Sequence, residues 1–164
     1  MFKKKCNFCG EEQPIYEGWV CICTKCQVSM FPDIPVKYIG YLMSRDELSR
    51  TEAIDWLSNH QTKNGDQIII LSLSDPNPVV SRFTERKILE KKLELAKDTL
   101  ISRLTEGLEL SEDGIKALGY IGDEQTIIEL EQYLESAPGM EEEYAAEEAI
   151  ERIQKRVLES KEDG

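Results

Sequence analysis

The chain has 164 residues, of which 40% are hydrophobic and 32% charged, and its net charge is −12. This composition is typical of a soluble globular protein, and it excludes a membrane-spanning one because no apolar run approaches the length of a bilayer crossing. The acidity belongs to residues 106–164, where five side chains are basic and eighteen are acidic, so we expect this part to stay solvated and to repel nucleic-acid phosphates.

The first predicted element is a metal site built from two Cys-x-x-Cys pairs. Cys6 and Cys9 form one pair, Cys23 and Cys26 form the other, and thirteen residues lie between the pairs. This spacing is typical of two knuckles that place four thiolates around one tetrahedral zinc ion, Zn2+. Because protein fills all four positions, we expect the ion to hold the fold and to catalyse nothing.

The residues around the two pairs refine this prediction. Gly10 allows a positive φ, which lets backbone N–H groups point at the sulfurs of the first knuckle. Residues 27–31 are predicted to form a short helix with Cys26 in its first turn. The fifth cysteine, Cys21, could compete with Cys23 for Cys26, but it lacks the knuckle spacing and we interpret it as a spectator thiol. A redox role for the pairs would need a βαβ context that the sequence lacks.

A Cys-x-Phe-Cys-Gly start, a Gln and a closing Cys-x-x-Cys mark the first thirty residues. The residues of this pattern are Cys6, Phe8, Cys9, Gly10, Gln13, Cys23 and Cys26. The pattern resembles the N-terminal zinc-binding domain of the ClpX protein-unfolding ATPase. The resemblance implies a treble-clef finger that dimerises and captures protein partners without catalysis of its own. It does not imply an ATPase, because the chain has no G-x-x-x-x-G-K-[ST] stretch to cradle phosphates.

Residues 32–43 are expected to link this finger, residues 1–31, to a second module. Pro32 and Pro35 interrupt any helix there, because proline lacks an N–H group and restricts the residue before it. The apolar residues that follow are partly strand-prone, and we expect them to pack the finger against the next module.

From Ser44 onward the hydrophobic pattern becomes helical. Ser44 and Glu47 fit a capping box, and the helix is expected to end near Asn59. Residues 66–73 are predicted to form the second helix of a hairpin, although their isoleucines favour a strand by propensity. Residues 77–107 are interpreted either as one long helix or as a hairpin broken near residues 97–98.

The clearest repeat comes later in the chain. Helices are predicted at residues 111–122 and 123–136, each with capping residues at its ends, and a last helix at residues 140–158. Similar alanine-led apolar stretches recur at offsets of 64 and 32 residues, a periodicity typical of stacked helical hairpins. They begin at Ala53, Ala117 and Ala149.

The sequences of residues 75–82 and 116–124 resemble those of HEAT repeats. The resemblance implies a short α-solenoid of recognition hairpins over residues 44–158. The acidic last helix is expected to cap this solenoid, and residues 159–164 are expected to fray.

The sequence also predicts where several other side chains lie. The lone histidine, His60, has polar neighbours and is expected to lie on the surface without a catalytic role. Residues 82–92 hold five basic side chains, which form either a solvated face with the interspersed glutamates or a contact patch for an acidic partner. Those glutamates are Glu85, Glu90 and Glu94. The aromatic residues expected in finger packing or in the repeat core are Trp19, Trp56, Tyr120 and Tyr133.

We therefore predict a mainly α protein with a small N-terminal zinc finger and a short solenoid of HEAT-like hairpins. Zinc thiolates, and a basic start that no apolar segment follows, indicate the reducing cytoplasm. The expected function is that of a non-enzymatic zinc-binding adaptor, whose finger and helical surface recognise protein partners and whose finger can pair in a homodimer. The alternative is a nucleic-acid or ribosome-associated module that would use the basic residues 82–92 and four lysines near the N-terminus. These are Lys3, Lys4, Lys5 and Lys25.

Overall fold

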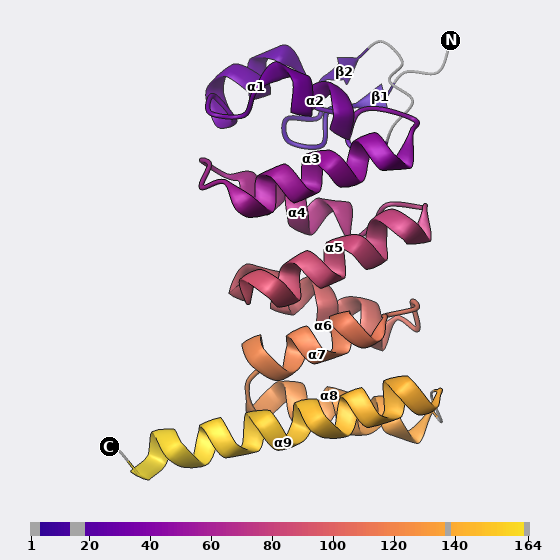
Figure 1. The fold of residues 1–164 in the computed structure, drawn as a ribbon, viewed down its shortest axis with the longest axis vertical. Coiled ribbons are helices and arrows are strands. Elements are labelled where there is room, and N and C mark those ends of the chain that lie inside the picture. Colours follow the sequence, from indigo (N-terminus) through magenta and orange to yellow (C-terminus); the bar gives the residue numbers. More distant parts are fainter. Residues whose placement is uncertain (1–3, 14–18, 137–138, 163–164) are drawn as a thin grey trace. The chain divides into compact units, whose positions relative to one another are not determined.

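The computed structural model describes residues 4–13, 19–136 and 139–162. These residues form two short strands, nine α-helices and one 3-10 helix, so the predicted mainly α fold is confirmed (Figure 1). Among the helices described, none combines the length and the hydropathy that a bilayer crossing needs. The elements are β1 (Lys4–Lys5), β2 (Glu12–Gln13), α1 (Thr24–Met30), α2 (Val36–Leu42), α3 (Glu47–Asn59), α4 (Gly65–Ser72), α5 (Pro78–Lys91), η1 (Glu94–Ala96), α6 (Lys97–Thr105), α7 (Glu112–Ile121), α8 (Glu124–Glu135) and α9 (Met140–Glu162).

The chain divides into two compact units, Met1–Lys87 and Ile88–Gly164, with the division inside α5. The domain boundaries expected from the sequence were placed where the finger gives way to helices, whereas these units are defined by their compactness. The expected boundaries therefore stay a prediction. In the first unit, the finger residues and the helices up to α5 share one compact body.

The segment expected to act as a linker forms helix α2, which packs on α3. Pro35 is the N-cap of α2, and its carbonyl accepts hydrogen bonds from the N–H groups of Tyr38 and Ile39. Proline is tolerated at this position because the N–H group of a residue ahead of the first turn would make no hydrogen bond within the helix. The helix buries Ile39 and Leu42, so this segment supplies core as well as connection.

The predicted capping box of Ser44 and Glu47 is wrong. The N-cap of α3 is Asp46, whose carboxylate accepts a hydrogen bond of 2.8 Å from the N–H of Ser49. The Ser44 hydroxyl instead accepts a hydrogen bond of 3.1 Å from the Asp46 N–H. Aspartate is as good an N-cap as serine, and its negative charge lies favourably at the positive end of the helix dipole.

The helix predicted after residue 65 is confirmed as α4, in spite of its strand-prone isoleucines. Ile68 and Ile69 are fully buried there, and α4 packs against α3. Tertiary burial therefore overrides local strand propensity in this segment.

A buried ion pair ties the start of α3 to the segment after α4. The Arg50 Nε and Nη2 atoms lie 2.8 and 3.1 Å from the two carboxylate oxygens of Asp75, and both side chains are almost fully buried. Arg50 Nη1 also donates to the carbonyls of Ser44 and Arg45, and Asp75 accepts a hydrogen bond from the Asn77 N–H. Such bidentate pairing with further hydrogen bonds is what makes a buried charge pair tolerable.

The region left open at residues 77–107 forms two helices with a 3-10 turn between them. Helix α5 ends at Lys91, and the next residue, Lys92, has a left-handed φ of 51°. The Leu93 N–H donates a hydrogen bond of 3.1 Å to the Ile88 carbonyl. This geometry is a helix C-cap of the kind that glycine usually provides. The chain therefore breaks five residues before Lys97.

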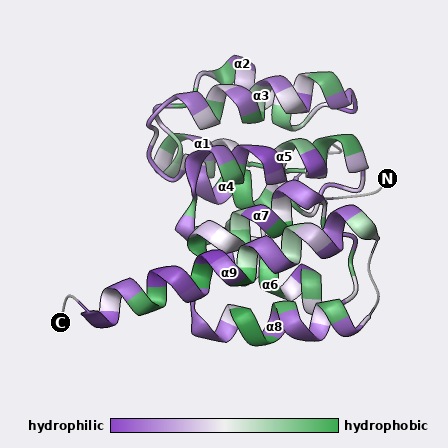
Figure 2. Ribbon diagram, turned by 60° about the horizontal axis from the view of Figure 1, so that its bottom comes forward, coloured by the Kyte–Doolittle hydropathy of each residue, from purple (hydrophilic) through white to green (hydrophobic). Residues whose placement is uncertain are grey.

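In the second unit, α7 packs closely against α9, and α8 packs against both α6 and α9. A Cβ atom at Gly119 would lie 2.9 Å from the Cα of Ala149, so the two helices meet at small residues. Figure 2 shows hydrophobic and hydrophilic residues alternating along α9, as expected for a helix that buries one face. Helix α9 extends through Glu162 and so includes most of the segment that was expected to fray.

Candidate metal centre

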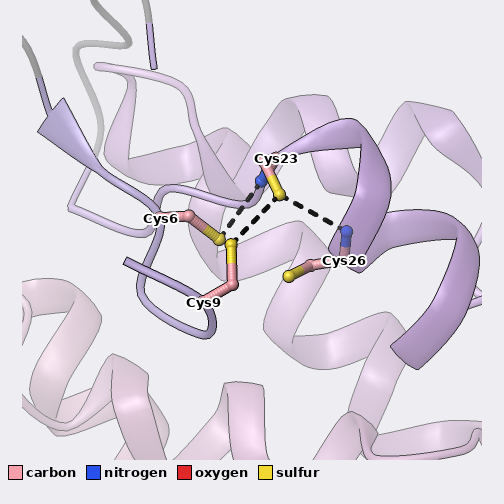
Figure 3. Close-up of side chains that lie close together, drawn as sticks. All are labelled: Cys6, Cys9, Cys23 and Cys26. Atoms are coloured by element: carbon pink, nitrogen blue, oxygen red, sulfur yellow. Dashed lines mark hydrogen bonds between the residues drawn. The ribbon is translucent and has the colours of Figure 1, made fainter. Parts of the chain in front are cut away.

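Four sulfurs converge in the finger of the first unit (Figure 3). The Sγ atoms of Cys6, Cys9, Cys23 and Cys26 all lie within 4.8 Å of one another, and those of Cys9 and Cys23 are 3.5 Å apart. Around a tetrahedral zinc ion with bonds of about 2.3 Å, sulfurs lie about 3.8 Å apart. The cluster therefore has the size and the donor set of a four-thiolate metal site.

The first knuckle is a tight turn that follows β1. The Cys6 N–H donates to the Glu11 carbonyl and the Gly10 N–H donates to the Cys6 carbonyl, at 2.8 and 3.0 Å. Gly10 has a φ of 76°, so the predicted left-handed glycine is confirmed. The antiparallel pairing of β1 with β2, in which Lys5 faces Glu12, closes the loop beneath the turn.

The second knuckle is the first turn of α1. Cys23 is the N-cap of this helix and its sulfur accepts a hydrogen bond of 3.4 Å from the Cys26 N–H, so the predicted place of Cys26 in a first turn is confirmed. The Cys23 N–H in turn donates to the sulfur of Cys6, also at 3.4 Å. A cysteine can replace the usual serine or aspartate as N-cap here because its sulfur accepts the same orphan N–H group.

Two hydrogen bonds between Asn7 and the backbone of Cys21 join the knuckles beside the sulfurs. The Asn7 N–H donates to the Cys21 carbonyl at 2.9 Å, and the Asn7 side-chain oxygen accepts from the Cys21 N–H at 2.6 Å. Cys21 is buried but lies outside the group of four, and burial raises the pKa of its thiol. Its backbone aligns the knuckles, while its sulfur takes no part in the cluster.

The electrostatics of the cluster favour a bound cation. Burial raises the pKa of Cys6, but backbone N–H donors from Cys23, Phe8 and Cys9 outweigh it and bring the pKa to about 6. Burial and the neighbouring sulfurs raise the pKa of Cys26. Crowded thiols therefore resist ionising together, and a divalent cation offsets this repulsion by binding all four as thiolates.

An aromatic contact packs the interior of the finger, and a hydrogen bond ties the end of α1 to the N-cap residue of α4. The rings of Phe8 and Phe31 meet edge to face with centroids 4.7 Å apart, and Phe31 is fully buried. The Asn64 side chain donates a hydrogen bond of 3.0 Å to the carbonyl of Met30, the last residue of α1. The finger is thus bonded to a residue that lies outside its own sequence.

His60 lies on the surface, as predicted. Its ring is exposed, stacks on Trp56 with centroids 4.2 Å apart, and places Nδ1 2.7 Å from the Trp56 carbonyl. Trp56 also stacks on Tyr38, so the aromatic ring predicted for the repeat core is half-exposed between two others.

Two of the basic residues singled out in the sequence form ion pairs with different acidic residues. Lys25 lies 3.8 Å from Glu11, and Lys87 lies 2.8 Å from Asp55. Glu85, assigned to a solvated face from the sequence, is fully buried, which corrects that interpretation. Lys3 lies outside the described residues.

The chain matches no protein-family model, no curated protein and no solved structure. Sequence reasoning also missed a pocket around Tyr120 in the second unit, where three cationic side chains from separate parts of the chain meet. The sequence signal was partial, because Lys92 belongs to the basic residues 82–92 but nothing in the sequence placed it beside Tyr120 and Arg152.

Proposed function

We propose that this protein is a non-enzymatic adaptor that recognises protein partners through a zinc finger and a helical-repeat surface. The observation that carries the proposal is the convergence of Cys6, Cys9, Cys23 and Cys26 within 4.8 Å. Four protein sulfurs complete the coordination of a tetrahedral ion, so no position is left for a reacting water or substrate. A closed site of this kind is structural.

Zinc is the proposed ion because a set of four thiolates in a tetrahedral arrangement suits it. The ion would supply folding free energy to the finger, because the described finger residues pair in only a two-residue hairpin and one short helix. The N–H groups of Cys23 and Cys26 would donate to the metal-bound sulfurs and orient them.

The helical part is proposed to be a HEAT-like recognition scaffold. Ala53, Ala117 and Ala149, which define the repeat register in the sequence, are all buried in helices α3, α7 and α9. Small residues at matching positions allow helices to pack closely, as the contact of Gly119 with Ala149 illustrates. The resemblance to the ClpX-type finger adds an expectation of partner capture and finger-mediated dimerisation, and we place the protein in the cytoplasm.

The proposal can be tested by affinity purification from the native cell, followed by mass spectrometry and metal analysis. The comparison needs the wild type, a Cys6→Ser and Cys9→Ser double variant, and Cys21→Ser as a matched control. We expect about one zinc per chain in the wild type and in the control, and loss of both zinc and finger-dependent partners in the double variant. Partners that all remain with the double variant would remove the finger from the proposed function.

RNA or DNA binding remains the alternative, and a gel shift separates it from the adaptor function. The adaptor predicts no retardation of either nucleic acid at physiological ionic strength. Retardation that weakens steeply with added salt would favour the alternative, because such binding releases counterions from phosphates.

A further inference from the structure

The second unit contains a pocket of about 330 Å³ that the metal centre does not explain. Its residues come from the end of α5 and from α7 and α9, with the ring of Tyr120 at the centre of the charged contacts. We call it the Tyr120 pocket. It is lined by Leu89, Lys92, Lys116, Tyr120, Glu148, Ala149 and Arg152.

Two cations lie over the same aromatic ring in this pocket. The guanidinium carbon of Arg152 is 4.1 Å from the centroid of Tyr120, and the ammonium of Lys92 is 4.8 Å from it. Such contacts attract each cation to the ring, but the two cations still repel each other. Both cations line the pocket, so an anionic group bound there would be attracted by both.

The charges in the pocket do not cancel. Arg152 pairs with Glu148 at 2.9 Å, and Lys116 pairs with Glu112 one turn earlier on α7. Within the part of the chain that the structure describes, Lys92 has the ring contact but no carboxylate partner. One positive charge is therefore available to an incoming anion.

The backbone at Lys92 is unfavourable for a lysine. Its φ of 51° is left-handed, and a side chain there costs about 1–2 kcal/mol that glycine avoids. A helix C-cap alone would favour glycine or asparagine at this position. The lysine side chain reaches Tyr120 from this strained position, which is how strain is typically retained at a binding site.

We propose that the Tyr120 pocket binds an acidic peptide segment of a partner, with one carboxylate between Lys92 and Arg152 and an adjoining apolar side chain against Leu89 and Ala149. Residues 88–164 carry nine basic and 21 acidic side chains, so their field repels long polyanions such as nucleic acids. A single carboxylate flanked by apolar residues meets the local positive charge and an apolar floor. This inference rests on the proposed adaptor function, for which it names the chemistry of one partner.

Fluorescence anisotropy of the purified full-length protein tests the inference directly. The probe is a fluorescein-labelled peptide with a single glutamate flanked by leucines, and its control has glutamine in place of that glutamate. We expect saturable binding of the acidic peptide and at least about tenfold weaker binding of the glutamine peptide, the scale of one lost charge-assisted contact. Equal binding of the two peptides would overturn the proposal.

Two variants place the binding in this pocket. Lys92→Gly and Arg152→Gln should each weaken binding by about tenfold or more, whereas Lys155→Gln, an equal charge loss on the exposed side of α9, should leave it nearly unchanged. Lys92→Gly relaxes the left-handed backbone, so its Tm should not fall below that of the wild type. Unchanged binding in Lys92→Gly, or a lowered Tm, would overturn the assignment.

Inorganic phosphate distinguishes a second source of the same anionic chemistry. If phosphate alone displaces the peptide at concentrations as low as the peptide itself requires, the pocket takes a phosphate-bearing small molecule and the acidic-peptide assignment fails. This assay uses no finger partner, so its failure leaves the zinc-dependent adaptor function standing. Conversely, retention of all partners by the Cys6→Ser and Cys9→Ser double variant would count against the finger's role and would not change the anisotropy result.

Discussion

The two compact units of this chain are stabilised in different ways. Met1–Lys87 carries eleven basic and eleven acidic residues and contains both the sulfur cluster and the buried pair of Arg50 with Asp75. Ile88–Gly164 carries nine basic and 21 acidic residues, and its helices meet at apolar and small side chains. Both units bury an apolar core, but the first adds buried polar interactions to it, whereas the second relies mainly on apolar contacts beneath a charged surface.

This difference has a physical reason in the size of the elements. The finger contributes a hairpin of two two-residue strands and a seven-residue helix. These elements have too little apolar surface for a core of their own. Helices α7, α8 and α9 have 10, 12 and 23 residues and can bury continuous apolar faces. Removing the metal or the buried ion pair of the first unit should therefore cost more than disturbing one apolar contact in the second.

The largest effect is expected from removal of the metal. A strong chelator, or the Cys6→Ser and Cys9→Ser double variant, should unfold the finger, because zinc binding at such sites contributes about 10–16 kcal/mol. Two-dimensional amide NMR should show the signals of residues 4–31 collapse while those of α7 to α9 keep their dispersion. Cys21→Ser is the matched control and should keep the finger signals. Finger signals that survive chelation would show that the fold does not depend on a metal.

The next largest effect is expected at the buried ion pair. Arg50→Ala leaves Asp75 as an uncompensated buried charge and should lower the free energy of unfolding by about 3–5 kcal/mol. Urea unfolding followed by circular dichroism measures this change. Lys37→Ala, which removes the exposed pair with Glu52, is the control and should change stability little. Similar losses in both variants would mean that burial does not set the value of the pair.

A pair of glycines compares helix packing in the two units. Gly119→Ala places a methyl group 2.9 Å from the Ala149 backbone and should destabilise by about 1–3 kcal/mol. Gly40→Ala in α2 meets no atom within 4 Å and should stabilise by about 0.5–1 kcal/mol through helix propensity. Thermal unfolding of the two variants should shift Tm in opposite directions. A shared direction would contradict the close approach of α7 and α9.

A modest effect is expected at the N-cap of α8. Asp123→Ala should cost about 0.5–2 kcal/mol, because the Asp123 carboxylate accepts the N–H of Thr126. A hydrogen bond from Lys97 lowers the pKa of Asp123 to about 2 from an ordinary 3.8. Since the folded pKa is the lower one, the charge stabilises the fold at pH 4 and above, and this contribution disappears as pH falls to about 2.

The pH dependence can be isolated with Asp123→Asn, which keeps a capping side chain but cannot titrate. Free energies of unfolding for the wild type and this variant should converge between pH 4 and pH 2. A difference that stays constant over this range would show that the Lys97 contact does not perturb Asp123 in solution.

The sequence predicted the elements that depend on local chemistry. The two Cys-x-x-Cys pairs, the left-handed Gly10 and the capped helices at residues 112–121 and 124–135 were all readable from spacing and residue type. The sequence was less informative where alternatives were locally equivalent. Ser44 and Asp46 are both good N-caps by residue type. In the structure Asp46 caps α3, and the Arg50 guanidinium donates hydrogen bonds to the carbonyls of residues 44 and 45 just before it.

The sequence by itself determined the four-sulfur donor set and the helical periodicity, because both follow from residues close together along the chain. Only the tertiary structure decided that Glu85 is buried and that Lys92, Tyr120 and Arg152 surround one pocket. These residues come from separate parts of the chain. Their proximity depends on how the helices pack, which the spacing of residues along the sequence does not determine.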